Sequence, residues 1–185
     1  MRAARMIAPL MLLTLASPAF AHDGHGGGLA QGLAHPFTGA DHLLAMIAVG
    51  LVAAMRGGRA AWALPLSFVA AAGLGFGAGR FGLTLPMVEP VILASVLLLG
   101  LLVMAAVPVN LVAGVALVAA FGVFHGQAHA AEAGSQAIAG FAAGFLMASA
   151  GLHAAGLALH HLTGTRWSRA AGAATVAGGL ALAFA

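Results

Sequence analysis

The sequence predicts an all-α membrane protein, in which a bundle of six transmembrane helices follows a signal peptide. Of the 185 residues, 62% are hydrophobic and only 6% are charged, whereas about 25% of residues are charged in soluble proteins. Six apolar segments are each long enough to cross a hydrocarbon core of about 30 Å. These predicted spans are residues 36–55, 61–79, 87–106, 108–129, 136–160 and 168–185.

The N-terminus has the pattern of a cleaved secretory signal. Two arginines precede a short apolar run at residues 6–15, and the small residues Ala19 and Ala21 suit a cleavage site. The alternative is a first transmembrane helix that stays attached, but the run is too short to span comfortably. We therefore divide the chain into a signal peptide at 1–21, a His/Gly-rich periplasmic tail at 22–34 and a six-helix transmembrane domain at 35–185.

Cleavage after Ala21 would expose a tail that begins with potential metal ligands. The new α-amine, His22, Asp23 and His25 can together hold a divalent cation loosely. The alternative is a polar tail with no binding role. His22 and His25 are therefore candidate residues for collecting the ion at the entrance of a metal path.

The arginines predict the orientation of the helices in a bacterial inner membrane. A cleaved signal leaves the mature N-terminus in the periplasm, so the loops after the first, third and fifth spans face the cytoplasm. Four arginines fall in two of these loops and only Arg80 falls on the other side, which agrees with the positive-inside rule. The cytoplasmic arginines are Arg56, Arg59, Arg166 and Arg169.

The first predicted span carries ionisable side chains at positions where apolar side chains would enter the membrane without a free-energy penalty. His35 and His42 are seven residues apart, so a continuous helix places them on one face, about 10 Å apart, with Gly39 between them and Met46 one turn deeper. Asp41 projects about 100° away from His42 on such a helix. We therefore expect that Asp41 and His42 do not pair with each other.

A second histidine–carboxylate cluster ends the fourth span. His125, His129 and Glu132 stand at i, i+4 and i+7, on one helix face. In the deduced topology this end is periplasmic, as is the start of the first span. The two clusters are therefore expected at the same depth, where they can form one site.

The fifth span carries a third stripe, which runs inward. Ser149, His153, Gly156 and His160 share a face, and we expect His153 to continue the metal path. His160 and His161 would lie near the cytoplasmic surface, where a histidine needs no special explanation. For a single intramembrane histidine the alternative is a polar link between helices.

The ligand types predict which metals can bind. Imidazole and carboxylate donors suit Ni²⁺, Co²⁺, Zn²⁺ or Cu²⁺, whereas Mg²⁺ and Ca²⁺ prefer oxygen ligands alone. The chain has no cysteine, so thiolate sites are excluded. The candidate metal ligands are His35, Asp41, His42, His125, His129 and Glu132, and the candidate path residues are His153, Met46, His22 and His25.

Two motifs make the sequence resemble the HupE/UreJ family of bacterial inner-membrane proteins. They are HPxxGxDH at residues 35–42 and FHGxAHxxE at residues 124–132. The resemblance implies a secondary nickel or cobalt permease associated with hydrogenase or urease, in which His35, Asp41, His42 and Glu132 are needed for transport and His125 and His129 belong to the second motif. One departure is Ala130, where the family usually has glycine.

We therefore expect a transporter rather than an enzyme, with Ni²⁺ or Co²⁺ as its substrate and no prosthetic group. No nucleotide-binding motif is present in the sequence, and nucleic-acid binding is a poor interpretation of the few arginines. Expected partners are the metal ion, membrane lipid, and a second copy of the chain or a metallochaperone. Two alternatives stay open, an intramembrane metal-dependent hydrolase and an accessory subunit that delivers metal without transporting it.

Overall fold

The computed structural model describes residues 27–134 and 137–185, and its regular secondary structure is helical, so the predicted all-α class is confirmed. The signal peptide, His22 and His25 lie outside the described residues. The elements are α1 (Gly27–Ala34), the short 3-10 helix η2 (His35–Phe37), α2 (Ala40–Arg56), α3 (Ala60–Arg80), α4 (Val88–Ala105), α5 (Leu111–Glu132), α6 (Ile138–Thr163) and α7 (Thr165–Ala183).

Each of the six predicted spans coincides with one of the helices α2 to α7. By length and apolar composition, four of these helices, α3, α4, α5 and α6, can cross a membrane by themselves. The bent pair of Gly28–Phe37 and Ala40–Arg56 brings the number to five if it is counted as one broken span. Helix α7 does not meet the same criterion, so the structure supports a multi-pass membrane protein with four to five spans.

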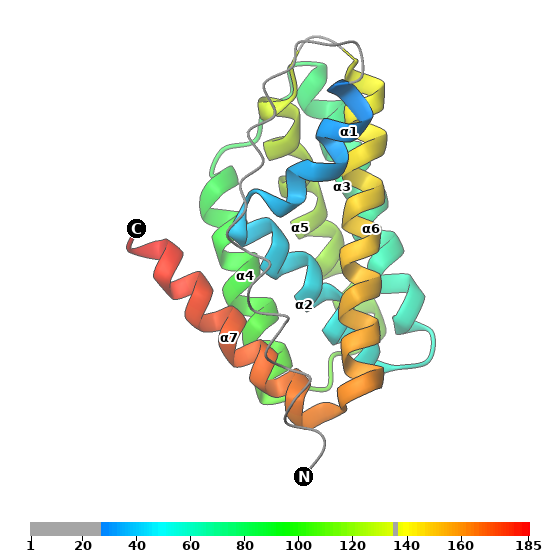
Figure 1. The fold of residues 1–185 in the computed structure, drawn as a ribbon, viewed down its shortest axis with the longest axis vertical. Helices are drawn as coiled ribbons and strands as arrows, with labels where there is room; N and C mark the ends of the chain where they lie inside the picture. Colours follow the sequence, from blue (N-terminus) through cyan, green and yellow to red (C-terminus); the bar gives the residue numbers. More distant parts are fainter. Residues whose placement is uncertain (1–26, 135–136) are drawn as a thin grey trace.

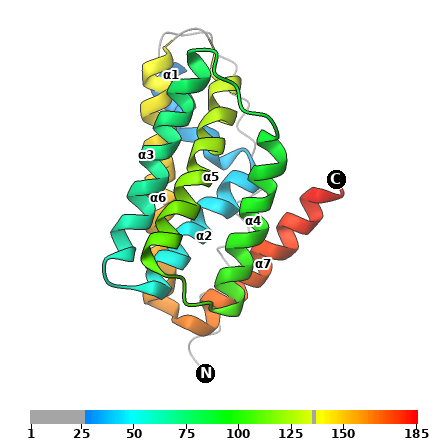
Figure 2. The same ribbon diagram turned by 180° about the vertical axis from the view of Figure 1, so that it is seen from behind.

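Helix α2 lies inside the bundle and is covered by its neighbours. It contacts α3, α4, α6 and α7, while α3 and α5 pair closely with each other. Helix α1 packs on α6 near one end of the molecule (Figures 1 and 2). Helix α7 packs on α4 and then diverges from the bundle toward the C-terminus (Figure 1). The middle of α2 is therefore buried, whereas its first residue Ala40 is exposed and Asp41 is half-buried.

The first predicted span is not one continuous helix, which corrects the sequence prediction. Pro36 lies in the first turn of η2, and Thr38 closes the turn because its Oγ1 donates to the carbonyl oxygen of His35 at 2.7 Å. Gly39 is then extended, at φ −100° and ψ 118°. The chain bends by 80° between the two helical parts. His35 and His42 thus lie on separate elements and do not share one helix face.

Residues 27–34, which we expected in the N-terminal tail, form helix α1. Two glycines allow its backbone to touch α6: a Cβ at Gly32 would collide with the backbone of Phe141, and one at Gly144 would collide with the backbone of Leu29. Such close approach of small residues is a common way to pack helices in membranes. This contact fixes the direction from which the chain enters η2.

Two further glycine contacts hold the helices that carry the site. A Cβ at Gly126 of α5 would meet the carbonyl oxygen of Ala72 on α3. Gly50 of α2 and Gly156 of α6 face each other, and a Cβ at either would collide with the backbone of the opposite helix. These contacts bring α3 against α5 and α2 against α6, and the buried histidines His42, His125, His129 and His153 lie on α2, α5 and α6.

The two ends of the bundle differ in charge. We call one the arginine end, where α2, α4 and α6 end; Arg56 donates there to the carbonyl oxygen of Val109, and Arg169 to that of Met104. Arg59, in the connection between α2 and α3, and Arg166, in the first turn of α7, lie at the same end. We call the other the glutamate end, where Glu132 closes α5 and Glu89 opens α4. Arg80 lies at the glutamate end, with its guanidinium close to the carbonyl oxygens of Ala130 and Ala133.

Candidate metal site

Three potential ligands from two elements converge at the glutamate end. Each of His35, His129 and Glu132 offers one ligand atom, and these atoms lie within 4.8 Å of one another. Nε2 of His35 donates to Oε2 of Glu132 at 2.7 Å, and Nδ1 of His129 lies 3.7 Å from the same oxygen. The group combines two nitrogens and one carboxylate, a donor set that suits a borderline divalent cation.

This group borders a cavity of about 190 Å³. Its wall contains residues of η2, α2, α4 and α5: His35, Thr38, Gly39, Asp41, His42, Glu89, His129 and Glu132. Glu132 is the most accessible of the three ligands at 47% exposure of its side chain, His35 follows at 23%, and His129 is buried at 1%. An ion from outside can therefore reach the carboxylate first and the buried imidazole last.

Asp41 pairs with His42, contrary to the expectation from a continuous helix. Nδ1 of His42 donates to Oδ1 of Asp41 at 2.9 Å, and the backbone N–H of His42 donates to the same oxygen at 2.7 Å. Asp41 lies in the first turn of α2, where backbone N–H groups have no partner inside the helix. Its carboxylate folds back to satisfy one of them and reaches the imidazole as well.

Gly39 provides the space for this pair. A Cβ at this position would lie 2.8 Å from Oδ1 of Asp41 and 3.2 Å from Nδ1 of His42. We expected Gly39 to leave room for an ion or another helix. In the structure, the space beside it holds the carboxylate and the imidazole.

His125 is oriented in a similar way, by a backbone group of its own helix. Its Nδ1 donates to the carbonyl oxygen of Phe121 at 2.9 Å. A neutral imidazole carries one proton, so a Nδ1–H leaves Nε2 with a free lone pair. The same holds for His42, whose Nδ1–H is held by Asp41. Both Nε2 atoms are thus ready to bind a metal, and such hydrogen bonds to the other nitrogen are typical of metal-binding histidines.

The histidine rings form a continuous series from the cavity into the core. The ring centroids of His35 and His129 are 5.0 Å apart, those of His129 and His42 are 4.6 Å apart, and those of His42 and His125 are 5.0 Å apart. The two clusters predicted from sequence therefore meet, although the first is divided between η2 and α2. His42 exposes 7% of its surface and His125 none.

Several buried ring nitrogens in this series have no hydrogen-bond partner. Within residues 27–134 and 137–185 they are Nε2 of His42, Nε2 of His125, and both ring nitrogens of His129 and His153. An unsatisfied buried polar group costs about 1–3 kcal/mol. A bundle that only needed polar links between helices would pair these atoms, so their free state favours a ligand that binds to them.

Aromatic side chains enclose the histidines, and the sequence analysis did not single them out. The ring of Phe145 lies 4.5 Å from that of His129, and the ring of Phe141 lies 5.2 Å from that of His35. Phe68 contacts His125 at 5.1 Å. In the sequence these residues look like ordinary apolar positions of spans, and no signal distinguishes them from other core residues.

The other candidate residues lie away from the close group. His153 is wholly buried on α6 and contacts Phe68, with ring centroids 5.0 Å apart. Met46 is wholly buried in the apolar core of the bundle. Nδ1 of His160, at the arginine end, lies 2.9 Å from Oγ of Ser168. Glu89, in the first turn of α4, also borders the cavity at the glutamate end.

Comparison with known proteins identifies the family of the chain. The chain is 40% identical over 188 residues to Protein HupE of Rhizobium leguminosarum bv. viciae, a match that covers 98% of each chain. No solved structure matches it. The family model described as HupE / UreJ protein matches residues 10–182. The chain therefore belongs to the HupE/UreJ family of membrane proteins.

Proposed function

We propose that this protein is a secondary transporter, a permease that carries Ni²⁺, or alternatively Co²⁺, across the bacterial inner membrane into the cytoplasm. One observation supports the proposal above all. A series of histidine rings, spaced 4.6–5.0 Å apart, leads from an accessible carboxylate into the core, and its buried nitrogens have no partner. A static structural site would need one ligand group, whereas a path needs several in succession.

The ligand chemistry selects the class of ion. The cavity offers imidazole nitrogens and the carboxylates of Asp41, Glu89 and Glu132, and the chain has no cysteine. These donors suit Ni²⁺ and Co²⁺ better than Mg²⁺ or Ca²⁺. Belonging to the HupE/UreJ family favours nickel within this class, with hydrogenase or urease maturation as its use.

Transport begins when the ion binds between His35, His129 and Glu132. Each ligand replaces a water molecule of the hydration shell, and the carboxylate offsets part of the positive charge. The ion then moves to the free Nε2 atoms of His42 and His125. Asp41 stays beside His42 and offsets more of the charge. His153 receives the ion next.

The membrane potential can drive this movement without ATP. A potential of 100 mV is worth about 2.3 kcal/mol for each elementary charge, so a dication gains about 4.6 kcal/mol. Since each 1.4 kcal/mol is a factor of ten, this corresponds to accumulation of roughly a thousandfold. The direction requires the glutamate end to face the periplasm and the arginine end to face the cytoplasm. The positive-inside rule favours that orientation.

Uptake of radioactive ⁶³Ni²⁺ tests the proposal. The host is a bacterium that lacks its own nickel importers, and wild type is compared with Asp41→Ala and His42→Ala. We expect uptake by the wild type and its loss in both variants. His161→Ala is the control, because this exposed histidine lies on α6 at the arginine end, outside the proposed path, and it should retain uptake.

The amount of each variant in the membrane is measured by immunoblot, so that loss of uptake is not confused with loss of protein. Normal uptake by Asp41→Ala would contradict the proposal. If the wild type takes up no nickel, ⁵⁷Co²⁺ replaces it. Failure with both ions would remove transport as the function.

The group of His35, His129 and Glu132 also favours one alternative. Three ligands with an open fourth position resemble the arrangement of catalytic zinc sites, where the metal activates a water molecule. An intramembrane hydrolase built on this group would retain one tightly bound metal through purification. A permease exchanges its ion readily, so metal analysis after dialysis distinguishes the two.

A further inference from the structure

The series of histidines is interrupted by Phe68 of α3. Its ring contacts those of His125 on α5 and His153 on α6, with centroid distances of 5.1 Å and 5.0 Å, whereas among the described residues no ring contact joins the two histidines directly. All three side chains have no exposed surface. The ring planes are inclined at 62° and 84°, so both histidines meet the phenylalanine in edge-to-face contacts. A benzene ring offers no lone pair to a cation, and it therefore separates the two histidines chemically as well as sterically.

His153 is isolated on the other side of this ring. Both of its ring nitrogens are buried and have no partner among the described residues. Among these residues, Phe68 is the aromatic side chain whose ring contacts that of His153. A histidine in this position has two free nitrogens, yet it has no exposed surface and does not border the cavity at the glutamate end.

Beyond His153 the bundle is closed by contact between two backbones. The carbonyl oxygen of His153 lies where a Cβ of Gly50 would be, and Gly156 lies equally close to the backbone of α2. Helices α2 and α6 therefore leave no passage between them at this level. Neither Phe68 nor His153 has any exposed surface, so the bundle is closed here.

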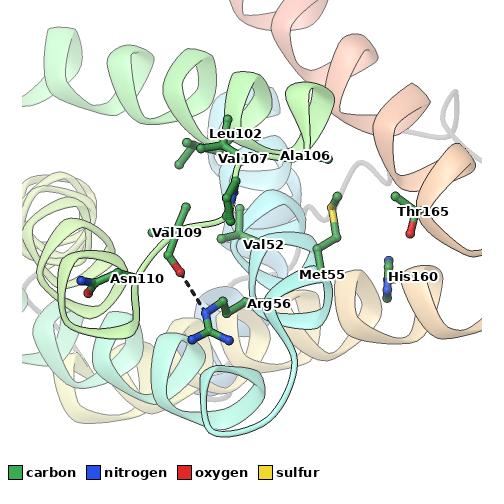
Figure 3. Close-up of a pocket in the computed structure, with 11 residues that line it drawn as sticks. Val52, Met55, Arg56, Leu102, Ala106, Val107, Val109, Asn110, His160 and Thr165 are labelled. Carbon is green, nitrogen blue, oxygen red and sulfur yellow. Dashed lines mark hydrogen bonds between the residues drawn. The ribbon is translucent and has the colours of Figure 1, made fainter.

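A second cavity opens below this seal, at the arginine end. It has a volume of about 480 Å³ and is bordered by α2, α4, α6 and the connection before α5. Figure 3 shows Met55 and His160 on one side of it and Val109 and Asn110 on another. His160 follows His153 by seven residues on α6, which is about 10 Å along the helix axis. The two cavities thus lie on opposite sides of a closed layer that contains Phe68 and His153.

Helix α3 has a weak point next to Phe68. Pro65 lies inside the helix, and proline cannot donate the hydrogen bond that the carbonyl oxygen of Ala61 would otherwise accept. Kinks and local adjustments concentrate at such positions. Because Phe68 follows Pro65 by three residues, a bend of α3 at Pro65 would move the phenylalanine ring relative to the two histidines.

We propose that Phe68 is the gate of the metal path, a ring that must move away before an ion can pass from His125 to His153. The inference rests on the proposed transport function. It adds a residue that belongs to neither histidine motif. Phe68 acts by excluding the ion and its water from His153 until α3 moves, so it is a positioning residue and not a ligand.

Thiol accessibility tests the gate without relying on transport. Since the chain has no cysteine, His153→Cys gives a single reactive thiol below the gate. Membrane vesicles with the glutamate end outside are treated with a small, membrane-impermeant methanethiosulfonate reagent. With Phe68 in place we expect slow labelling. With Phe68→Ala we expect labelling at least tenfold faster, and with Phe68→Leu an intermediate rate.

Phe76→Ala is the matched control, because Phe76 is another buried phenylalanine of α3 and its recorded ring contacts are with Phe141 and Phe145. It should leave the slow labelling unchanged. Size-exclusion chromatography in detergent shows that each variant is folded. Equal labelling of the thiol with Phe68, Leu or Ala at position 68 would overturn the proposal.

A second measurement connects the gate to nickel. Phe68→Trp enlarges the ring, so we expect ⁶³Ni²⁺ uptake to fall at least tenfold while nickel binding to the purified protein stays unchanged. Unchanged uptake would overturn the gate. If the wild type transports no nickel, the proposed function fails, but the thiol experiment still decides whether Phe68 closes the path to His153.

Discussion

At the scale of single residues, the site depends on which nitrogen of each histidine is free. Asp41 and the carbonyl oxygen of Phe121 hold Nδ1 of His42 and His125, respectively. Each contact leaves Nε2 as the nitrogen that could bind a metal. The two Nε2 atoms belong to rings 5.0 Å apart. Neither contact was expected from the sequence, yet together they orient the inner half of the site.

Asp41→Asn tests this orientation. An asparagine keeps the size of the side chain but removes its charge, so His42 is held less firmly and is a weaker ligand. Loss of such a partner typically lowers metal affinity by about 10–100-fold. We expect a drop of that size in Ni²⁺ affinity, measured by isothermal titration calorimetry on purified protein. Glu89→Gln removes a charge from the same cavity without touching His42, so a decrease as large as that of Asp41→Asn would contradict the interpretation.

Gly39→Ala tests the space beside the pair. The new methyl group would lie 2.8 Å from Oδ1 of Asp41, and one of the two must shift. We expect nickel uptake to fall at least tenfold, because His42 loses its partner. Gly134→Ala is the control, since a Cβ there has open space around it. Equal uptake by the two variants would mean that the contact between Asp41 and His42 is not needed.

The residues of the site could be predicted from sequence better than their contacts. Histidine and carboxylate side chains are conspicuous in an apolar chain, and their spacing predicted both clusters, one at the start of the first span and one at the end of the fourth. The pair of Asp41 and His42 was missed because neighbours in a helix interior point in different directions. In the first turn of a helix this rule fails, since a carboxylate there can turn back toward free N–H groups. A phenylalanine such as Phe68 gives no signal at all.

At the scale of elements, the break between η2 and α2 is the feature that builds the outer site. It lets His35 approach from one direction and His42 from another, so that both rings lie within 5.0 Å of the ring of His129. A proline near the start of a span does not by itself predict a break, because proline is tolerated in a first helical turn. Helix α1 was missed for a related reason: its glycines suggest a tail unless the partner helix α6 is known.

Contacts between helices are tested by two glycines of α3 that stand two residues apart. A Cβ at Gly75 would collide with the carbonyl oxygen of Val123 on α5, whereas a Cβ at Gly77 has nothing within 4 Å. Gly75→Ala should therefore push α3 and α5 apart and destabilise the protein by about 1–3 kcal/mol. Gly77→Ala should be neutral or slightly stabilising, because alanine favours the helix. The midpoints of thermal unfolding in detergent compare them, and equal midpoints would contradict the contact.

At the scale of the whole molecule, charge and cavities divide the bundle into two unlike ends. The cavity at the glutamate end carries potential metal ligands. The larger cavity at the arginine end is lined by one arginine and no carboxylate. A cation that reaches the second cavity meets positive charge and few ligands, which favours its release. In the proposed transport path, this difference would favour movement of the ion from the glutamate end to the arginine end. Whether that movement is uptake depends on which end faces the cytoplasm.

The orientation, and the number of crossings, can be measured with single cysteines in this cysteine-free chain. Thr84→Cys, at the glutamate end, and Thr163→Cys, at the arginine end, are both exposed. A thiol reagent that does not cross the inner membrane should label Thr84→Cys in intact cells and label Thr163→Cys only after lysis. The reverse pattern would invert the proposed direction of transport.

Ala185→Cys then decides the role of α7. If α7 crosses the membrane, the protein has six spans and the C-terminal thiol is labelled in intact cells, like that of Thr84→Cys. Helix α7 has 19 residues and packs on α4 through a seam of small residues that includes Gly172 and Gly179, which supports a crossing. However, it diverges from the bundle and does not meet the criterion for a span. Labelling only after lysis would place the C-terminus on the same side of the membrane as Thr163. Helix α7 would then not cross the membrane, and the protein would have five crossings in all.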